Sequence, residues 1–313
     1  MKKPRRISPQ VLLTGATATL ATLSGEQYCH ATHQTPPPDI SARLPMSMQH
    51  FAFHRENVLG TSFELLVNSV RPGEAELCEQ QVLAEVERLR LILSTYDSTS
   101  EINRVRAGSP VESSDLKSLL SAYDLWAERT GGAIDVNMAE VIGLWKGAKT
   151  VAPSEEELAK AIAQPCAYNV DALGKGYIID RAVEVARRFA PSGLLNIGGD
   201  IRVWGEQTWN IGIADPFAPA ENSKQLSGFA LRNGAVATSG GYSRFVNLGG
   251  QRYSHIIDPR TLRPANGVAS ASSRISVPQR RRHGRRRGKF NPKCFHRRFT
   301  RRSLSLIQIA LRR

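Results

Sequence analysis

The sequence changes character near Gly193, and this change limits the folds that the chain can adopt. Before it, residues 74–93 repeat apolar side chains at the spacing of one helix face, and residues 114–132 give a second helical pattern. After it, short β-prone runs alternate with glycine-rich turns. Helices followed by strands predict an α+β fold with mixed, largely antiparallel sheets and flanking helices.

Further elements follow from the same patterns. We expect a strand over residues 60–70 and helices over residues 155–163 and 177–190. The later strands are expected within residues 193–205, 208–216, 228–240 and 243–259. Gly249-Gly250 suits a tight hairpin turn in the last of these segments.

The positive charge of the chain is concentrated at its C-terminal end. The chain has 42 Lys and Arg against 28 Asp and Glu, and 14 of the basic residues lie in residues 278–313, which contain no acidic residue. The remaining 28 basic residues balance the 28 acidic ones, whereas a nucleic-acid binder usually spreads basic side chains over a folded face. We therefore predict a domain over residues 36–277 and an aberrant basic tail, disordered, over residues 278–313.

The N-terminal residues 1–35 resemble an export signal or leader followed by the start of a linker. A basic head with Arg5-Arg6 precedes a mildly apolar stretch that is too polar to span a bilayer. This pattern fits the twin-arginine route and predicts a periplasmic or cell-envelope location. A disordered N-terminus without an export role stays open, because no clear cleavage site is present.

Two cysteines lie within the predicted domain. Cys78 and Cys166 have neither C-x-x-C nor metal-site spacing. We expect both to be buried free thiols.

Glycine-rich and polar corners bound the predicted helices and strands. They are "LGTSF" (59–63), "STYDSTSEINRV" (94–105), "GGAIDVN" (131–137), "DALGKGYIID" (171–180), "LLNIGGDI" (194–201), "ATSGGYSRF" (237–245) and "YSHIIDPRTLRP" (253–264). Glycines at such corners let backbone N–H groups approach the phosphates of a ligand. No corner is specific by itself, and the common nucleotide-binding and hydrolase motifs are missing.

Taken together and in this order, the corners resemble the FAD:protein FMN transferases, the ApbE family, from about Leu59 to Val277. The resemblance implies an ApbE-like, T-fold-related architecture and a Mg²⁺-dependent flavin transferase of the periplasm. The resemblance further implies that the substrate of this enzyme is FAD and that the product is a partner protein with post-translational flavinylation. FMN passes to a Thr or Ser hydroxyl of an acceptor flavoprotein, such as a membrane redox-complex subunit, and AMP is released.

The resemblance assigns the chemistry to three residues. His255 is the base that takes the proton of the acceptor hydroxyl, the backbone carbonyl of Gly174 helps to hold Mg²⁺, and Lys175 meets the pyrophosphate. A structural role for His255 and an exposed, idle Lys175 are the alternatives. The turn at residues 198–200 is expected to shape the fold rather than to contact the ligand.

The resemblance also assigns further positions to cofactor binding: Leu59, Tyr96, Ala133, Ile134, Asp135, Thr238 and, besides its catalytic role, His255. Leu59 stands where the family usually has Met. Tyr96 offers an aromatic face, with burial in the core as its alternative. Leu262 replaces a customary Gly, so we expect a less tight turn there.

The chain departs from the family after Val277. Family members continue with a strand and a helix start whose Asp and Thr side chains complete the Mg²⁺ site, but here the arginine-rich block follows. If the arginines of residues 282–288 have CGN codons, reading one nucleotide later gives triplets compatible with Ala-Met-Ala-Ala-Asp-Ala. We hypothesise that the reading frame is lost between about Ser276 and Arg282. AGA or AGG codons in an intact frame would contradict this.

The loss makes the activity of the translated chain doubtful, since a backbone carbonyl alone is a poor Mg²⁺ ligand. The alternatives are an FAD-hydrolysing enzyme, an inactive FAD-binding remnant, or a basic-tail binder of nucleic acid or lipid. Nucleic acid is the less favoured partner, because the aromatic residues of the tail are sparse. The sequence names neither the acceptor nor the oligomeric state.

Overall fold

A seven-stranded antiparallel sheet forms the centre of the computed structural model, which describes residues 48–69, 71–217, 226–240, 245–265, 268–276 and 309–312. Its strands, in sheet order, are β1 (Gln49–Val58), β2 (Thr61–Ser69), β3 (Ser192–Ile197), β4 (Asp200–Trp204), β7 (Gly234–Gly240), β12 (Val268–Ser276) and β13 (Ile309–Arg312). All neighbouring strands pair antiparallel. The predicted α+β class is confirmed.

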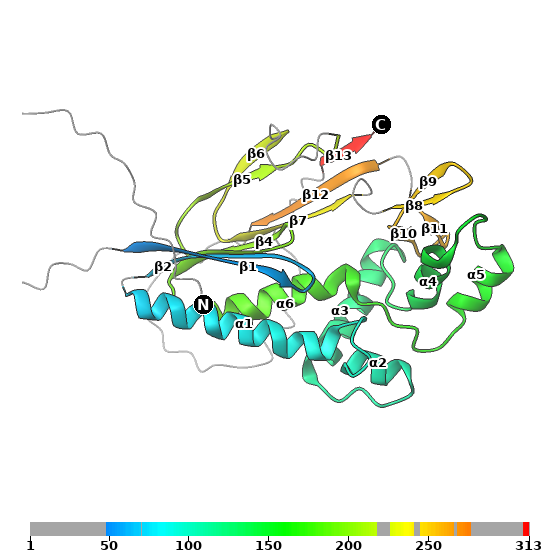
Figure 1. The fold of residues 1–313 in the computed structure, drawn as a ribbon, viewed down its shortest axis with the longest axis horizontal. Helices are drawn as coiled ribbons and strands as arrows, with labels where there is room; N and C mark the ends of the chain where they lie inside the picture. Colours follow the sequence, from blue (N-terminus) through cyan, green and yellow to red (C-terminus); the bar gives the residue numbers. More distant parts are fainter. Residues whose placement is uncertain are drawn as a thin grey trace, which may run out of the picture.

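Helices and short strand pairs surround this sheet (Figure 1). The helices are α1 (Pro72–Leu93), α2 (Glu101–Arg106), α3 (Ser114–Thr130), α4 (Ala139–Gly147), α5 (Glu155–Ile162) and α6 (Asp171–Ala186). The strand pairs are β5 (Trp209–Ile213) with β6 (Ser227–Leu231), β8 (Phe245–Leu248) with β9 (Gln251–Ser254), and β10 (Ile257–Asp258) with β11 (Arg263–Pro264).

The two faces of the large sheet pack against different elements. Alternate side chains of each strand point to opposite faces, so neighbouring residues join different clusters. Leu195 and Ile197 of β3 join the buried cluster shared with α1, α3 and α6, while Leu194 joins a smaller cluster with Ile211 of β5 and Leu231 of β6. Figure 1 shows α1 and α6 along one side of the sheet and the β5–β6 pair on the other. We call the large sheet with α1, α2, α3 and α6 the main body.

A second, smaller unit lies at one end of the molecule (Figure 1). It comprises α4, α5 and strands β8 to β11, which pack around six buried residues. These are Met138, Val141, Trp145, Leu158, Ala161 and Leu248. We call this unit the His255 lobe, since His255 lies between β9 and β10.

The structure corrects some sequence expectations and confirms others. The Gly249-Gly250 turn joins β8 to β9, with positive φ at both glycines. Helix α6 begins at Asp171 rather than at residue 177, because the N–H of Leu173 is satisfied by the Tyr123 hydroxyl (3.2 Å), which supports an earlier first turn. Strand β1 and helices α2 and α4 were not expected.

The two cysteines also differ from each other. Cys78 is a buried free thiol, as expected. Cys166 is exposed, so the expectation of burial was wrong. It lies after α5 in a loop with a left-handed φ of 56°, which turns the chain toward α6 at the surface.

The predicted leader, residues 1–35, lies outside the described residues, as does most of the basic tail. Residues 309–312 of the tail form β13, so the expectation of disorder does not apply to them. Among the helices of the described chain, none is long and apolar enough to cross a membrane.

Candidate functional site

Two glycine-rich turns meet at one end of the large sheet. The N–H of Gly198, in the β3–β4 turn, donates to the carbonyl of Ser62 in β2 (3.0 Å). A Cβ at Gly198, whose φ is +57°, would come within 2.6 Å of the Thr61 hydroxyl oxygen. Leu59 takes a left-handed φ of 53° in the β1–β2 turn and packs against the core of the main body. Glycine at position 198 is therefore required for this close approach.

Lys175 lies beside the same turns. Its Nζ is 2.9 Å from the carboxylate of Asp200 and 3.4 Å from the carbonyl of Gly198. The side chain is 34% exposed, which leaves one side open to an anion. Lys175 is thus a partnered lysine at the sheet end rather than an idle surface residue, and the 198–200 turn, expected only to shape the fold, holds its charge.

Gly174 is buried in the second turn of α6. Inside a continuous helix its carbonyl accepts the N–H four residues later, which engages one of the two lone pairs of the oxygen. Among the described residues, no three His, Cys, Asp or Glu side chains gather as a metal site. The described residues therefore do not supply a complete set of side-chain ligands for Mg²⁺.

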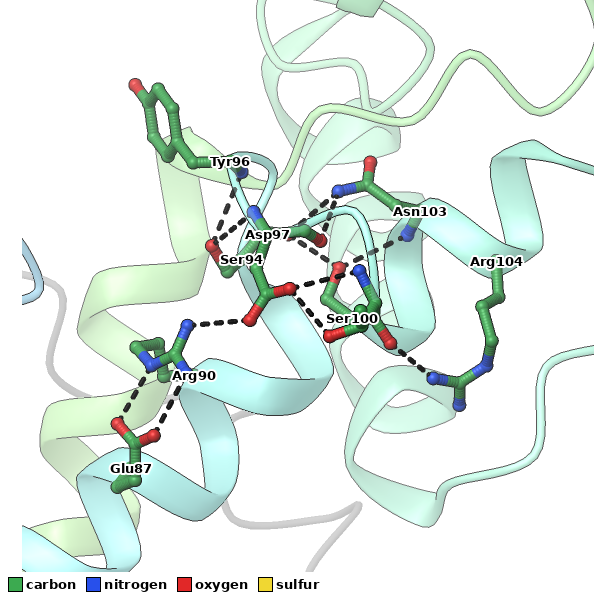
Figure 2. Close-up of polar contacts among 9 residues, drawn as sticks. Glu87, Arg90, Ser94, Tyr96, Asp97, Ser100, Asn103 and Arg104 are labelled. Carbon is green, nitrogen blue, oxygen red and sulfur yellow. Dashed lines mark hydrogen bonds and ion pairs between the residues drawn. The ribbon is translucent and has the colours of Figure 1, made fainter.

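Tyr96 stands on a loop between α1 and α2 and is 81% exposed, so burial in the core does not apply. The loop beneath it is held by many polar contacts (Figure 2). The hydroxyl oxygen of Ser94 accepts the N–H groups of Tyr96 and Asp97 (3.3 and 3.2 Å). The hydroxyl and N–H of Thr99, together with the guanidinium of Arg90, lower the pKa of Asp97 to about 2. The ring is exposed on a loop whose backbone is held by hydrogen bonds.

The Tyr96 loop touches the start of α6. The hydroxyl of Thr95 donates to a carboxylate oxygen of Asp171 (3.4 Å), and the amide of Asn169 donates to the other oxygen (3.1 Å). Asp171 occupies the first turn of α6, where a negative charge is favourable. No signal in the sequence singled out Asp171, because the helix was expected to begin only at residue 177.

The corner at residues 131–137 links the main body to the His255 lobe. Ile134 packs against the core of the main body, and Ala133 is half-buried beside it. Asp135 is exposed and accepts the N–H of Asn137 (2.8 Å). A Cβ at Gly132 would lie 3.7 Å from the side chain of Arg260, which places the loop after His255 against this corner.

His255 is exposed in the lobe, and contacts on both sides fix its loop. The Trp145 ring lies 5.5 Å from the ring of Tyr253, and its N–H donates to the carbonyl of Leu262 (2.8 Å). Leu262 adopts a left-handed φ of 57°, so the turn forms in spite of the missing glycine. A bidentate contact with Arg260 and the N–H of Arg260 lower the pKa of Asp258.

Thr238 lies on β7, next to the end of β4. The β4–β7 register pairs Ile201 with Val236, two residues before Thr238 on β7. Its hydroxyl lies 2.8 Å from that of Ser272 on β12, in an exposed stretch of the strand. The hydroxyl therefore has a structural partner on the neighbouring strand.

The contacts thus join most of the predicted corners. The turns at 59–61 and 198–200 contact each other, and the second turn contacts Lys175 of α6. The start of α6 contacts the Tyr96 loop, and the segment before it contacts the 131–137 corner. This corner in turn contacts Arg260 in the loop after His255. Arg260 was not predicted as a site residue, although its position directly after the "SHIIDP" motif could have indicated it. A separate surface hollow of about 570 Å³, lined by Arg106, Glu140 and Cys166 among others, contains none of the predicted site residues.

Comparison with known proteins supports the same grouping. The family model described as "ApbE family" matches residues 59–273. The FAD:protein FMN transferase of Treponema pallidum is 28% identical over 259 residues, which cover 67% of this chain and 70% of that protein. The enzyme of the same name from Rhodobacter capsulatus is 38% identical over 109 residues, 33% of this chain and 20% of that protein.

Solved structures show the same fold. The ApbE protein of Thermotoga maritima superimposes with a TM-score of 0.63 at 28% identity and covers 73% of this chain and 82% of its own. The flavinyl transferase ApbE of Pseudomonas stutzeri gives a TM-score of 0.62 at 23% identity, with coverage of 72% and 80%.

Proposed function

Because the chain belongs to the ApbE family, we propose that it transfers the FMN moiety of FAD to a Thr or Ser hydroxyl of an acceptor flavoprotein and releases AMP. The observation that supports this most is the meeting of glycine turns, Lys175 and the exposed ring of Tyr96 around the sheet end and the start of α6. Such a site offers one cation to a pyrophosphate and an aromatic face to a ring.

The reaction asks for positioning more than for covalent chemistry by the protein. His255 takes the proton of the acceptor hydroxyl, and the hydroxyl oxygen forms a bond to the phosphorus of the FMN moiety. The P–O bond to the AMP moiety breaks, and AMP leaves with the bridging oxygen. Lys175, which the ion pair with Asp200 holds in place, stabilises the negative charge of the pyrophosphate with its ammonium group.

Magnesium dependence is proposed from the family resemblance, not from a donor set in the described residues. We therefore expect little transfer by the chain as translated. A chain whose reading frame is restored after about residue 276 should regain Mg²⁺-dependent transfer, and chelation with EDTA should then abolish it.

The test is incubation with FAD, Mg²⁺ and an acceptor flavoprotein, using both the translated chain and the frame-restored chain. Mass spectrometry should detect the FMN adduct on the acceptor, and chromatography should detect an equal amount of AMP. Release of AMP without an FMN adduct on the acceptor would indicate that the protein hydrolyses FAD. Bound FAD without AMP, in both chains, would indicate an inactive flavin-binding remnant.

His255 has a matched control in His54, an exposed histidine paired with Glu56 on β1 (2.6 Å). His255→Gln should lower the transfer rate of the frame-restored chain by about 10²–10⁴-fold, the usual contribution of a general base. His54→Gln should leave the rate unchanged. Equal rates for His255→Gln and the parent chain would assign His255 a structural role only.

Export to the periplasm or cell envelope is proposed from the residues before the described part of the chain. Replacing Arg5-Arg6 by two lysines should retain the protein in the cytoplasm if the twin-arginine route is used. Cell fractionation followed by immunoblotting measures this, and an unchanged distribution would reject that route.

A further inference from the structure

Asn103 of α2 closes the loop that carries Tyr96. Its amide nitrogen donates to the carbonyls of Ser94 (3.2 Å) and Asp97 (2.8 Å), which flank Tyr96 on both sides (Figure 2). A side chain that is 81% exposed gains little from its own packing, so its position depends on the backbone beneath it. One amide group therefore fixes the base of Tyr96.

The oxygen of the same amide faces the other way. It accepts a hydrogen bond from Nη1 of Arg106 (2.8 Å), one helical turn later in α2. Arg106 then donates from Nε (2.6 Å) and Nη2 to the carbonyl of Tyr168. With two carbonyls at its nitrogen and a guanidinium at its oxygen, the amide of Asn103 has a matched partner on each side.

Tyr168 lies just before α6, the helix that contains Gly174 and Lys175. The connection from Asn103 through Arg106 thus reaches the segment that enters the helix. The hydrogen bond from Thr95 to Asp171 joins the same two segments at a second place. Side chains other than Tyr96 and Lys175 thus connect the loop of the aromatic ring to the segment that enters the helix of the lysine.

We propose that Asn103 and Arg106 are positioning residues that set Tyr96 relative to the start of α6, so that the ring and Lys175 meet one FAD molecule. The inference rests on the proposed function, in which Tyr96 and Lys175 contact that ligand. Holding the loop before the ligand arrives removes the entropic cost of ordering it on binding.

FAD titration followed by flavin fluorescence tests the proposal. Asn103→Ala and Arg106→Ala should each weaken FAD binding by about tenfold, the size expected for a lost hydrogen-bond contribution. Because both residues act in one connection, the double variant should lose about as much as either single variant. Purely additive losses would contradict the coupling.

Arg104 provides the matched control. It lies between the two residues on α2, is exposed, and donates to the carbonyl of Thr99 in the same loop without reaching α6. Arg104→Ala should leave FAD affinity within about twofold of the parent. Asn103→Asp keeps the partner of Arg106 but loses both donors to the loop, so it should not restore affinity; full recovery in Asn103→Asp would overturn the role given to the donors.

A spectroscopic readout separates positioning from general stability. A tyrosine that stacks on the flavin ring quenches its emission, so the emission of saturating bound FAD should rise equally in Asn103→Ala and in Tyr96→Ala. The melting temperature of Asn103→Ala should fall by only about 2–4 °C, the size expected for about 1 kcal/mol of lost hydrogen bonding. A fall in melting temperature with unchanged bound-FAD emission would instead show a structural role and reject the proposal.

Hydrogen exchange of the protein without ligand tests the connection through Asn103 and Arg106 independently of the proposed flavin transfer. Arg106→Ala should speed exchange both in residues 94–100 and in residues 166–173, because the connection runs in both directions. Exchange that rises in neither segment would reject the coupling, whatever the protein binds. A second outcome is faster exchange in both segments of Arg106→Ala, with unaltered FAD binding in Tyr96→Ala. It would support the connection between the segments but show that Tyr96 does not contact FAD, and it would overturn the proposal as stated.

Discussion

The main body and the His255 lobe each carry part of the predicted site, but they hold it by different means. In the main body, Lys175 and Tyr96 stand on segments that rest on the largest buried cluster and on a dense set of polar contacts. In the lobe, His255 stands on a loop held by Trp145 and a cluster of six buried residues. The groups proposed to bind FAD thus rest on a large buried cluster, whereas the proposed base rests on a small one.

Two tryptophans make this difference measurable. Trp204 of β4 is 1% exposed and donates its N–H to the carbonyl of Ala190 (3.0 Å); Trp145 of α4 is 3% exposed and donates to Leu262 (2.8 Å). Each replacement by alanine should cost about 3–5 kcal/mol of local stability. Trp204→Ala should lower the melting temperature of the whole protein.

Trp145→Ala should open the lobe alone. Hydrogen exchange should rise in residues 139–162 and 245–265, while α1 and α6 stay protected. An equal loss of protection in α1 and α6 would show that body and lobe unfold as one unit, and the comparison would then fail.

The turn at Gly198 tests the rigidity of the main body at the site. Gly198→Ala adds a left-handed non-glycine residue and a contact with Thr61 of 2.6 Å, so we expect a loss of about 2–4 kcal/mol in the free energy of unfolding. Gly199 also has a positive φ, but open space surrounds its Cβ position, so Gly199→Ala should cost less. Chemical denaturation of both variants measures the difference; equal costs would mean that strain alone matters.

A buried carboxylate should make the stability of the main body more sensitive to acid pH than that of the His255 lobe. Glu101 is 4% exposed, and its Oε1 accepts the N–H groups of Glu112 and Ser113 (2.8 Å each). Burial opposes its charge, but the hydrogen bonds from Ser113 and Glu112 prevail and lower its pKa. Its contribution is therefore present above the unfolded-state pKa and is lost as the pH falls through the lower folded-state pKa.

Glu101→Gln should cost about 1–2 kcal/mol near neutral pH, and the gap to the parent protein should shrink on acidification below pH of about 4. In the lobe, Asp258 also has a lowered pKa, but its partner Arg260 is largely exposed. Asp258→Asn should therefore have a smaller, salt-sensitive effect. Urea denaturation across pH measures both; a gap for Glu101→Gln that widens in acid would contradict the pKa direction.

Leu262→Gly should produce the smallest change. Glycine would relieve a left-handed strain of about 1–2 kcal/mol, but it would remove a side chain that packs against the buried cluster of the lobe. The two effects oppose each other, so stability should change by less than about 1 kcal/mol. Thermal unfolding checks this, and a large loss would show that Leu262 packing, rather than the hydrogen bond of Trp145, holds the turn.

Much of the fold followed from local patterns. The apolar repeat of α1, the change to strands after Gly193 and the Gly249-Gly250 turn depend on neighbouring residues, and each is present in the structure. The start of α6 did not follow, because it depends on the Tyr123 hydroxyl, fifty residues away in the sequence. Cys166 was misjudged because burial depends on the surrounding fold rather than on residue type.

By itself the sequence determined the family and the order of the corners, since motifs of a few adjacent residues set turns and strand ends locally. Only the tertiary structure decided which corners meet: Lys175 with Asp200, Asn103 with Arg106 and Tyr168, and Gly132 with Arg260. The reason is that hydrogen bonds and ion pairs act over a few ångströms, and only the packing of α6 and the lobe against the sheet brings such distant residues within that range.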